Sequence, residues 1–544
     1  MTPQQQAQVL RQIDALINAG NAPQAIRAAR GAAERGVTHY LVFVMSGLYE
    51  MEANAPANAL VFARRALDMK PRGHEALQVL GMALAGQGQH QDAVRAYDEC
   101  LRAKPGNSDV HYHKGLSLEE IGELGRARRE YERAIDIDPR HAGAAAHLAT
   151  IAVMQGQTEQ GRDLVQKALR LKPDEPAVLL SLAQLELNAG NFDAVLRIAA
   201  PFLASRPQTS ANDRGVAESL SGDALDELGR HAEAFAHYRR ANQTFKDLHD
   251  RLYGSLALER VPARARRILA WLDGADLARW RDCDPGRYRA PVETHVFLVG
   301  FPRSGTTLLE QVLASHDRIE ALEERDCLAS AMAQFILPPD GIERLAALSG
   351  DDLSRLRDAY WAAARAGGAS LDRPVFVDKL PFNLLNWPLI AKLFPGAKML
   401  LALRDPRDVV LSCFRRRFRM SPFMYEMFTL DSAAGFYAAT MDFAQFCRAN
   451  LTLPFFVSRY EDLVGDFKPS VQAICGFLGL EYDDAMRDFA ETARGRVIRT
   501  PSAPQVARGL YSSGMGQWRA YRDQLAPVMP TLAPWVADFG YEET

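Results

Sequence analysis

The chain has little cysteine and no long apolar run. Its 544 residues include 6 cysteines, and these do not stand in the paired spacing typical of a disulfide framework or a zinc site. A run of about 18 apolar residues, which a membrane-spanning helix needs, is missing. Residues 1–20 lack the basic-then-apolar pattern of a secretion signal. We therefore expect a protein of a reducing compartment with no membrane span.

The chain also lacks an excess of one charge. Its 64 Lys and Arg residues nearly balance 67 Asp and Glu residues, which gives a formal net charge of −3 at pH 7. This balance gives no general case for binding to nucleic acid or to a membrane surface. Histidines such as His90, His111 and His113 are scattered and form no ligand cluster with cysteine, so no metal site is predicted. At this length more than one domain is expected.

The N-terminal half is a sequence repeat. A glycine or asparagine recurs in steps of 34 residues, a small residue follows most of them five positions later, and proline recurs at the same interval. This period and pattern are typical of tetratricopeptide repeats, in which each unit is a pair of antiparallel helices. A further, shifted unit includes Gly229, Ala234 and Tyr238. The repeated positions are Gly20, Asn54, Gly88, Gly122, Gly156 and Gly190; Ala25, Ala59, Ala93, Ala127 and Gly161; and Pro71, Pro105, Pro139, Pro173 and Pro207.

The repeats predict a tetratricopeptide α-solenoid over residues 1–250. Such units bury a continuous core only by stacking, and they present an extended groove. A bridging helix or linker is expected over residues 251–291, and a second domain over residues 292–544. Two uses of the groove remain open, namely capture of a peptide acceptor or adaptor protein, and a role as an oligomerisation or scaffolding arm. Because tetratricopeptide repeats as a family bind proteins, a protein partner is favoured.

The second half opens with a strand, a turn and a helix. Apolar residues 296–299 lead into the turn 300–305, and Thr306 and Thr307 begin a helical pattern. Such a turn offers backbone N–H groups and the positive end of a helix to an anion. It has the two glycines of a P-loop, but Thr306 replaces the P-loop lysine and Arg303 lies inside the turn. We expect a phosphate-bearing ligand with less terminal charge than a nucleoside triphosphate. The alternative is an ordinary strand–helix turn.

A second strand–turn–helix follows the apolar residues 398–403. Arg404 comes directly after this expected strand, Ser412 lies two turns into the next helix, and Arg416 lies one turn further on. Ligands of open α/β sheets bind at the carboxyl ends of strands, and guanidinium and hydroxyl groups suit a phosphate. Two anion sites at neighbouring strand ends indicate a nucleotide that is phosphorylated at two places.

The ordered pair FPRSGTT (residues 301–307) and RDPRDVVLS (residues 404–412) resembles the sulfotransferase family. This family uses 3′-phosphoadenosine 5′-phosphosulfate, and the arginine form of the first loop is most similar to the protein-tyrosine sulfotransferase branch and its bacterial relatives. The resemblance covers roughly residues 290–535. It implies a P-loop-like α/β domain with a central parallel sheet and no metal. It also implies that the first loop holds the 5′-phosphosulfate and the second segment the 3′-phosphate. The residues implied are Arg303, Ser304, Gly305, Thr306 and Thr307 for the first group, and Arg404 and Ser412 for the second; Arg416 is added because it lies one turn after Ser412 on the same helix face.

The resemblance also implies the catalytic residues. A Glu-Glu pair places the general base, which takes the proton of the acceptor hydroxyl, on Glu324, with Glu323 or His316 as alternatives. Lys379, at an expected strand end, would stabilise the leaving phosphate. The alternative is that the two glutamates are solvated residues at the start of a helix and that Lys379 is a solvated residue of a loop. Ser502 resembles the late serine that assists this lysine, and Tyr460 resembles a tyrosine near the cofactor.

Two departures from the family qualify this expectation. Close relatives carry a basic residue before the last tryptophan, whereas here Gln517 precedes Trp518, and the candidates to replace that contact are Arg508, Ser513 and Arg519. The missing secretion signal differs from the eukaryotic tyrosine-sulfating enzymes, so a cytoplasmic bacterial enzyme is expected.

The predicted function is sulfuryl transfer from 3′-phosphoadenosine 5′-phosphosulfate to an acceptor hydroxyl. A peptide tyrosine is one candidate acceptor, and a sugar, a lipid and a small phenol are the others. A catalytically silent tetratricopeptide adaptor is the alternative of a different class. A P-loop kinase is disfavoured by the missing lysine.

Overall fold

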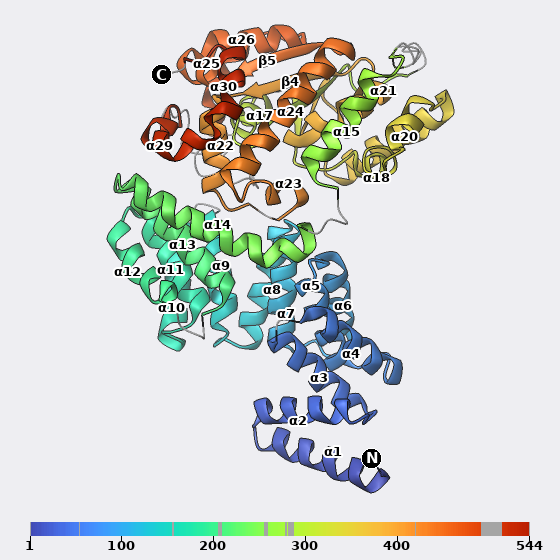
Figure 1. Ribbon diagram of the computed structural model, residues 1–544, viewed down its shortest axis with the longest axis vertical. Coiled ribbons are helices and arrows are strands. Elements are labelled where there is room, and N and C mark those ends of the chain that lie inside the picture. Colours follow the sequence, from blue (N-terminus) through green and yellow to red (C-terminus); the bar gives the residue numbers. More distant parts are fainter. Residues whose placement is uncertain are drawn as a thin grey trace. The chain divides into compact units, whose positions relative to one another are not determined.

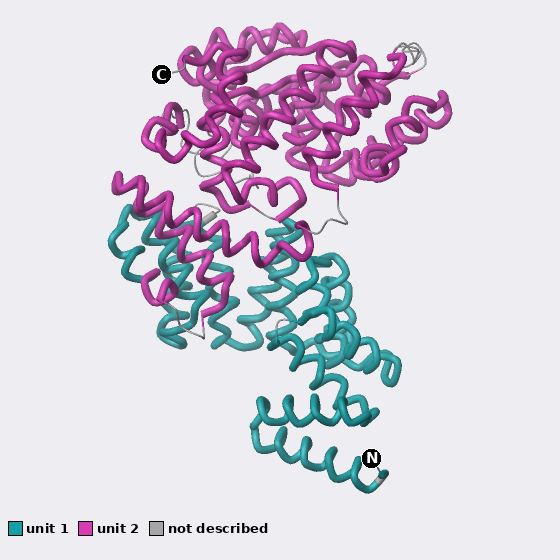
Figure 2. Tube along the Cα trace, in the orientation of Figure 1, with its two compact units in different colours: residues 1–198 teal, residues 199–544 magenta. Residues whose placement is uncertain are grey.

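The chain divides into two compact units in the computed structural model, Met1–Ile198 and Ala199–Thr544 (Figure 2). The residues described are 2–53, 55–154, 157–204, 209–254, 259–277, 280, 288–418, 420–490 and 514–542. The boundary between the units falls inside helix α12 (Phe192–Leu203). None of the helices in these ranges is both long and apolar enough to cross a membrane.

The first unit is a series of helix pairs. Helix α3 packs on α4, α5 on α6, α7 on α8 and α9 on α10, and each pair also contacts the next (Figure 1). The helices of this unit are α1 (Pro3–Asn18), α2 (Ala22–Glu34), α3 (Tyr40–Glu52), α4 (Pro56–Met69), α5 (His74–Gly86), α6 (His90–Ala103), α7 (Ser108–Glu120), α8 (Leu124–Ile137), α9 (Ala142–Met154), α10 (Thr158–Leu171) and α11 (Pro176–Asn188).

The recurring glycines and alanines have local reasons for their positions. Gly88 and Gly122 follow the first helix of their pairs with φ of 74° and 78°, a left-handed conformation that glycine adopts without steric cost. Ala93 and Ala127 have no exposed surface, because the two helices of each pair pack closely there. The predicted repeat positions Asn54, Gly156 and Pro207 lie outside the described residues.

The second unit begins with one more helix pair and continues into an α/β domain. Its helices before the sheet are α13 (Ala211–Glu227), α14 (His231–Tyr253) and α15 (Val261–Asp273). The strands are β1 (Thr294–Gly300), β2 (Ile319–Glu323), β3 (Val375–Lys379), β4 (Lys398–Leu403) and β5 (Phe455–Arg459). The remaining helices are α17 (Thr306–Ala314), α18 (Ala329–Phe335), α19 (Gly341–Ala346), α20 (Gly350–Ala366), η1 (Pro381–Asn386), α21 (Trp387–Leu393), α22 (Pro406–Arg415), α23 (Pro422–Tyr425), α24 (Leu430–Asn450), α25 (Tyr460–Gly465), α26 (Phe467–Leu478), η2 (Asp484–Asp488), η3 (Gln517–Tyr521), α29 (Arg522–Leu525), η4 (Ala526–Val528) and α30 (Met529–Asp538).

The α13–α14 pair has the same internal packing as the repeats of the first unit. A Cβ atom added to Gly222 would lie 2.7 Å from the ring of Tyr238, just as one added to Gly115 would lie 2.5 Å from the ring of Tyr131. In both pairs the glycine allows the first helix to approach a tyrosine of the second. The shifted unit indicated by Tyr238 is therefore a repeat-like hairpin that belongs to the second compact unit.

The centre of the second unit is a five-stranded sheet in the order β2-β3-β1-β4-β5, and all paired strands run parallel. Both faces of the sheet are covered by helices. Successive side chains of β1 point to opposite faces and so join different cores. Phe297 joins a core that includes residues of α20, α21 and α24, whereas Val296 joins a core with α17, α25 and α26. The prediction of tetratricopeptide helices followed by an α/β domain with a central parallel sheet is confirmed.

Parallel strands bring their carboxyl ends to one edge of the sheet. Those ends are Gly300 for β1, Glu323 for β2, Lys379 for β3, Leu403 for β4 and Arg459 for β5. Since ligands of open parallel sheets bind at this edge, it is the place to examine for a functional site.

Candidate functional site

The turn after β1 has the form of an anion-binding loop. Arg303 and Gly305 have φ of 71° and 98°, so the backbone is left-handed at both positions. Ser304 Oγ donates a hydrogen bond of 2.6 Å to the carbonyl of Phe301, which closes the turn. Helix α17 begins immediately afterwards at Thr306, and the first N–H groups of a helix have no partner within it. The loop therefore presents backbone donors and a positive helix end at the edge of the sheet.

Three strand ends meet around this loop. Arg303 Nε donates to Ser412 Oγ at 3.0 Å, and Arg404 Nη1 donates to the carbonyl of Arg303 at 3.1 Å. The ring of Tyr460, directly after β5, packs on the loop, since a Cβ atom on Gly305 would lie 2.8 Å from its Cδ2 atom. The guanidinium of Arg404 lies 5.1 Å from the centre of the Tyr460 ring. These predicted cofactor residues thus form one cluster.

The Arg404 side chain is buried and has a donor that no described residue uses. Arg404 is 6% exposed, and its Nε atom has no hydrogen-bond partner among the described residues. Its Nη2 atom donates to the carbonyl of Gly514 and lies 3.8 Å from the carboxylate of Asp408. A buried N–H group without a partner costs free energy, so this atom is suited to receive an anionic ligand.

Arg416 has a different environment. It caps the C-terminal end of α22, and its Nη1 atom lies 3.7 Å from Asp223 on α13. Its side chain is 35% exposed. Among the described contacts Arg416 is therefore paired with the repeat-like hairpin, and its assignment to the cofactor stays a prediction.

The α13–α14 hairpin holds the end of α22, which sequence reasoning did not foresee. Asn242 donates to the carbonyl of Phe414 at 2.8 Å, and the ring of Phe235 stacks on that of Phe414 at 5.2 Å. Arg415 pairs with Asp226 of α13 and also donates to Gln517 Oε1 at 3.3 Å. Gln517, the residue that departs from the family pattern, therefore lies against α22. No local pattern could have revealed contacts between such distant parts of the sequence.

Lys379 and Glu324 are in contact at the other side of β1. Lys379 Nζ donates to Glu324 Oε1 at 2.9 Å, and the backbone N–H of Glu324 donates to the carbonyl of Lys379 at 2.8 Å. The lysine side chain is fully buried, whereas that of Glu324 is 35% exposed. Burial lowers the pKa of Lys379, but the carboxylates of Glu310, Glu324 and Glu323 raise it by more, so the net pKa lies above its ordinary value. The lysine is therefore an ammonium beneath an accessible carboxylate.

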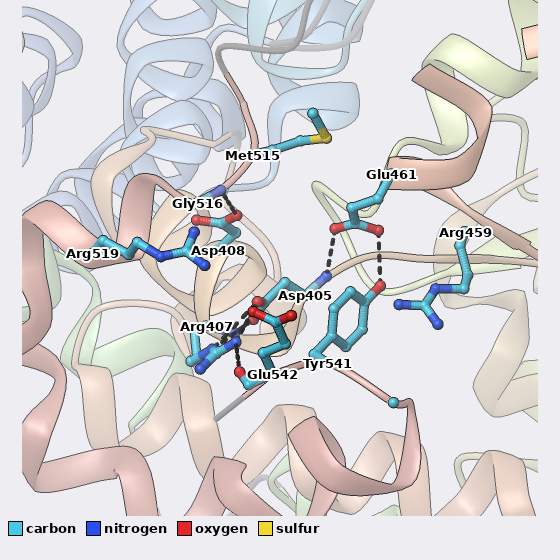
Figure 3. A pocket seen from close by; sticks show the side chains of 11 residues that line it. Asp405, Arg407, Asp408, Arg459, Glu461, Met515, Gly516, Arg519, Tyr541 and Glu542 are labelled. Atoms are coloured by element: carbon cyan, nitrogen blue, oxygen red, sulfur yellow. Dashed lines mark hydrogen bonds and ion pairs between the residues drawn. The ribbon is translucent and has the colours of Figure 1, made fainter. Parts of the chain in front are cut away.

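Ser502 lies outside the described residues, as do the replacement candidates Arg508 and Ser513. The third replacement candidate, Arg519, lines a small polar pocket of about 260 Å³ (Figure 3). Arg407 in this pocket is bound by Asp405 and the carbonyl of Glu542, and Asp408 accepts the N–H group of Gly516 at 2.7 Å. These contacts tie the C-terminal segment to the start of α22. The lining residues are Asp405, Arg407, Asp408, Arg459, Glu461, Met515, Gly516, Arg519, Gly540, Tyr541 and Glu542.

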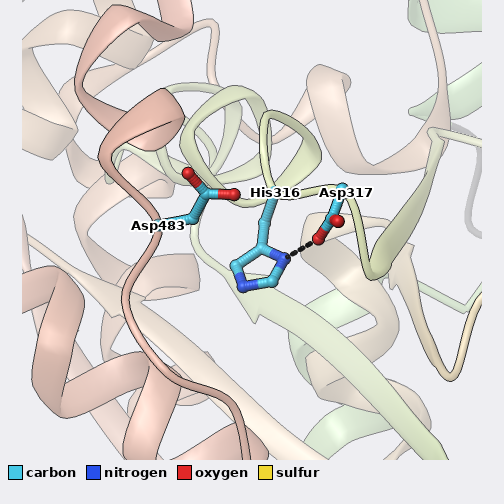
Figure 4. A group of neighbouring side chains, drawn as sticks. All are labelled: His316, Asp317 and Asp483. Carbon is cyan, nitrogen blue, oxygen red and sulfur yellow. Dashed lines mark ion pairs between the residues drawn. The ribbon is translucent and has the colours of Figure 1, made fainter.

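His316, an alternative base, stands beside Asp317 and Asp483 (Figure 4). Its Nε2 atom contacts the carbonyl of Glu481 at 3.1 Å, and its Nδ1 atom accepts the N–H group of Arg318 at 3.0 Å. Asp483 accepts the N–H group of Ala485 at the start of η2. Both ring nitrogens of His316 therefore have partners, and its role as an alternative base stays a prediction.

Comparisons with known proteins find matches for both parts of the chain. A family model described as "Sulfotransferase family" matches residues 295–484, and two models described as "Tetratricopeptide repeat" match residues 79–142 and 118–178. An uncharacterized protein of Aquifex aeolicus (strain VF5) is 22% identical over 438 residues, which are 77% of this chain and 53% of that protein. Protein-tyrosine sulfotransferase 2 of Gallus gallus is 25% identical over 262 residues, which are 45% of this chain and 69% of that protein.

The chain spans about half the length of the Aquifex relative. The sulfotransferase match contains the loop after β1, the ends of β2 to β5 and the start of α22. The resemblance indicated by the two sequence motifs is thereby confirmed. Residues 295–484 therefore match the sulfotransferase family, and the repeats before them match tetratricopeptide families.

Proposed function

We propose that the second unit transfers a sulfuryl group from 3′-phosphoadenosine 5′-phosphosulfate to an acceptor hydroxyl. One observation carries this proposal: the two anion-binding segments touch, through the 3.0 Å bond from Arg303 Nε to Ser412 Oγ. Two adjoining phosphate sites suit a nucleotide with one phosphate at each side of its ribose. A triphosphate chain would need the lysine that Thr306 replaces.

The residues present fit such a nucleotide. The loop at Gly305 and the N-terminal end of α17 would hold the 5′-phosphate through backbone donors. Arg404, whose buried Nε donor has no partner in the described part of the chain, and Ser412 would hold the 3′-phosphate. Tyr460 lies against both segments and would flank the nucleotide.

The nucleotide supplies the sulfuryl group and a phosphate leaving group. Glu324, which reaches the surface, would accept the proton of the attacking hydroxyl. Lys379 would place a fixed positive charge where negative charge develops on the leaving oxygen, and its burial means that no water has to reorganise around it. The assisting role of Ser502 stays a prediction.

The acceptor is proposed from the relatives. The Gallus gallus protein is named a protein-tyrosine sulfotransferase, so a peptide tyrosine is the acceptor that we propose. The tetratricopeptide repeats would bind a protein, either the acceptor itself or an adaptor.

Calorimetry with adenosine 3′,5′-bisphosphate, the expected product, tests the proposal. This nucleotide should bind the full chain in the absence of Mg²⁺, and more tightly than ATP with Mg²⁺. A preference for ATP with Mg²⁺ would instead support the kinase alternative, and binding of neither nucleotide would support the silent adaptor. Transfer of labelled sulfate to tyrosine peptides, sugars and phenols then tests the acceptor.

A further inference from the structure

A third carboxylate lies against the buried lysine of the candidate site. Glu310 stands on α17, one turn after Thr306, and it is fully buried. Its Oε2 atom lies 3.3 Å from Lys379 Nζ, and neither carboxylate oxygen has a hydrogen-bond partner within the described part of the chain. A buried carboxylate without hydrogen bonds is costly unless a cation compensates it. Lys379 is that cation.

The three carboxylates around Lys379 are not equivalent. Glu323 is the last residue of β2, and Glu324 follows it. The carboxylate of Glu324 lies 2.9 Å from Lys379 Nζ and its side chain is 35% exposed. The carboxylate of Glu323 lies 3.8 Å from Lys379 Nζ and its side chain is 12% exposed. Glu310 approaches from α17, the helix whose N-terminal end is the proposed phosphate site, and its side chain has no exposed surface. An acceptor hydroxyl arriving from solvent can therefore meet Glu324 but not Glu310.

In the proposed reaction Glu324 and Glu310 would have different roles. When the acceptor oxygen bonds to sulfur, its proton passes to Glu324, and the bond from sulfur to the phosphate oxygen breaks with its electron pair on that oxygen. Protonation makes Glu324 neutral, so its charge pairing with Lys379 is lost at the moment when the lysine has to be charged. A carboxylate that acceptor and water do not reach keeps its charge through this step.

We propose that Glu310 is a positioning residue that anchors Lys379 beside the phosphate loop and keeps it an ammonium while Glu324 takes the proton. This inference rests on the proposed function. The groups that face the lysine are Glu310 from α17 and Glu323 and Glu324 from the end of β2, and Asp378 precedes it on β3. The charge of Glu310 is one of those that raise the pKa of Lys379 against its burial.

The first experiment measures stability and needs no activity. Lys379→Met, Glu310→Gln and the double variant are made in the full chain, and their melting temperatures are compared with that of the wild type. Lys379→Met should lower the melting temperature more than Glu310→Gln does, because it leaves Glu310 buried without a cation. The double variant should melt above Lys379→Met. If the effects of the two single changes simply add, the pair is not coupled and the inference is wrong. If Lys379→Met fails to fold, recovery of a folded double variant supports the pair and continued failure overturns it.

The second experiment separates positioning from packing. The pH profile of turnover is measured for Glu310→Gln and for a matched control, Glu320→Gln. Glu320 lies on β2, the edge strand next to β3, and its carboxylate binds Ser370 and the N–H group of Leu371 at 2.7 Å, away from Lys379. The basic limb of the Glu310→Gln profile should move to lower pH by about one unit, since Lys379 loses a compensating charge. The control should keep the wild-type limb.

The outcomes distinguish this inference from the proposed function. A Glu310→Gln limb that coincides with the wild-type limb overturns the positioning role, even if turnover falls. A wild-type chain that binds no adenosine 3′,5′-bisphosphate and transfers no sulfate overturns the proposed function. In that case coupled melting temperatures would show a structural ion pair only, and the positioning role would fall with the proposed function.

Discussion

The single residue Glu324 has an unusual backbone conformation. Its φ is 41°, in the left-handed region where a residue with a side chain is strained by about 1–2 kcal/mol. The bond from its N–H group to the carbonyl of Lys379 holds it there. Such strain persists where surrounding structure fixes it, and it is frequent at functional sites. Here it belongs to a partly exposed carboxylate that accepts a hydrogen bond from the buried lysine.

Replacing Glu324 tests the general base. Glu324→Gln keeps the size of the side chain but removes the proton acceptor, so turnover should fall by roughly 10²- to 10⁴-fold. The affinity for adenosine 3′,5′-bisphosphate should stay nearly unchanged. Single-turnover kinetics and calorimetry measure the two quantities. Glu323→Gln is the matched comparison, and a larger loss for Glu323→Gln would move the base to that residue.

Arg404 tests the 3′-phosphate site. Arg404→Ala should weaken binding of adenosine 3′,5′-bisphosphate by about 1.5–3 kcal/mol, the value of a hydrogen bond to a charged group. Binding of adenosine 5′-monophosphate, which lacks the 3′-phosphate, should change much less. Arg416→Ala should have a smaller effect than Arg404→Ala, because Arg416 is paired with Asp223. Equal weakening for both nucleotides would place Arg404 outside the 3′-phosphate site.

The buried carboxyl of Asp378 should make the stability of the chain depend on pH. Its carboxyl is fully buried, which raises its pKa from 3.8 to about 7, although the hydrogen bond from Tyr360 opposes the rise. Because the pKa is higher in the folded state, the folded chain binds the extra proton, and this contribution to stability is lost as the pH rises from about 4 through 7. The loss is of the order of 4 kcal/mol at most. Chemical unfolding at pH 5 and pH 8 measures it, and Asp378→Asn should reduce the difference between the two. An equal pH dependence in Asp378→Asn would show that another group is responsible.

At the scale of elements, helix α22 depends on the α13–α14 hairpin. Ser412 is in its last turn, and the residues that follow are held by the hairpin through Phe235 and Asn242. Arg415 pairs with Asp226, which also accepts a hydrogen bond from Tyr521 of η3. The hairpin, α22 and η3 therefore support one another, and the hairpin becomes part of the framework of the candidate site.

Asp226 tests this support. The side chains of Arg415 and Asp226 are 8% and 14% exposed, so Asp226→Ala leaves a buried guanidinium without its carboxylate. The free energy of unfolding should fall by about 3–5 kcal/mol, as expected for a broken buried ion pair. Glu233→Ala on the same hairpin removes an exposed pair with Arg230 and should leave the stability nearly unchanged. Comparable losses in the two variants would mean that the Asp226 contact does not hold α22.

At the scale of the whole molecule, the compact units and the sequence pattern suggest different places to divide the chain. The pattern predicts a solenoid up to residue 250, whereas the second compact unit begins at Ala199 and includes α13 and α14. The first unit is built from helix pairs that each contact their neighbours. Such an array can lose members without removing the contacts that α22 needs.

Two truncations test this division. A chain that begins at Ser210, the N-cap of α13, keeps the contacts of Phe414 and Arg415 and should fold and bind adenosine 3′,5′-bisphosphate as the full chain does. A chain that begins at Arg251 loses these contacts and should unfold at a lower temperature and bind more weakly. Calorimetry and thermal unfolding measure both. If the two truncated chains behave alike, the hairpin is dispensable for the candidate site.

The repeats, the parallel α/β class and the two loops that carry Arg303 and Arg404 can be predicted from the sequence, because each of these depends on local periodicity and on turn residues. The order of the strands, which brings Lys379 to the side of β1 opposite Arg404, is known only from the fold. The same is true of the Glu310–Lys379 pair and of the contacts by which α13–α14 holds α22. Residues far apart in the chain meet according to how crossover helices pack on the sheet, and the spacing of residues within one segment does not contain that information.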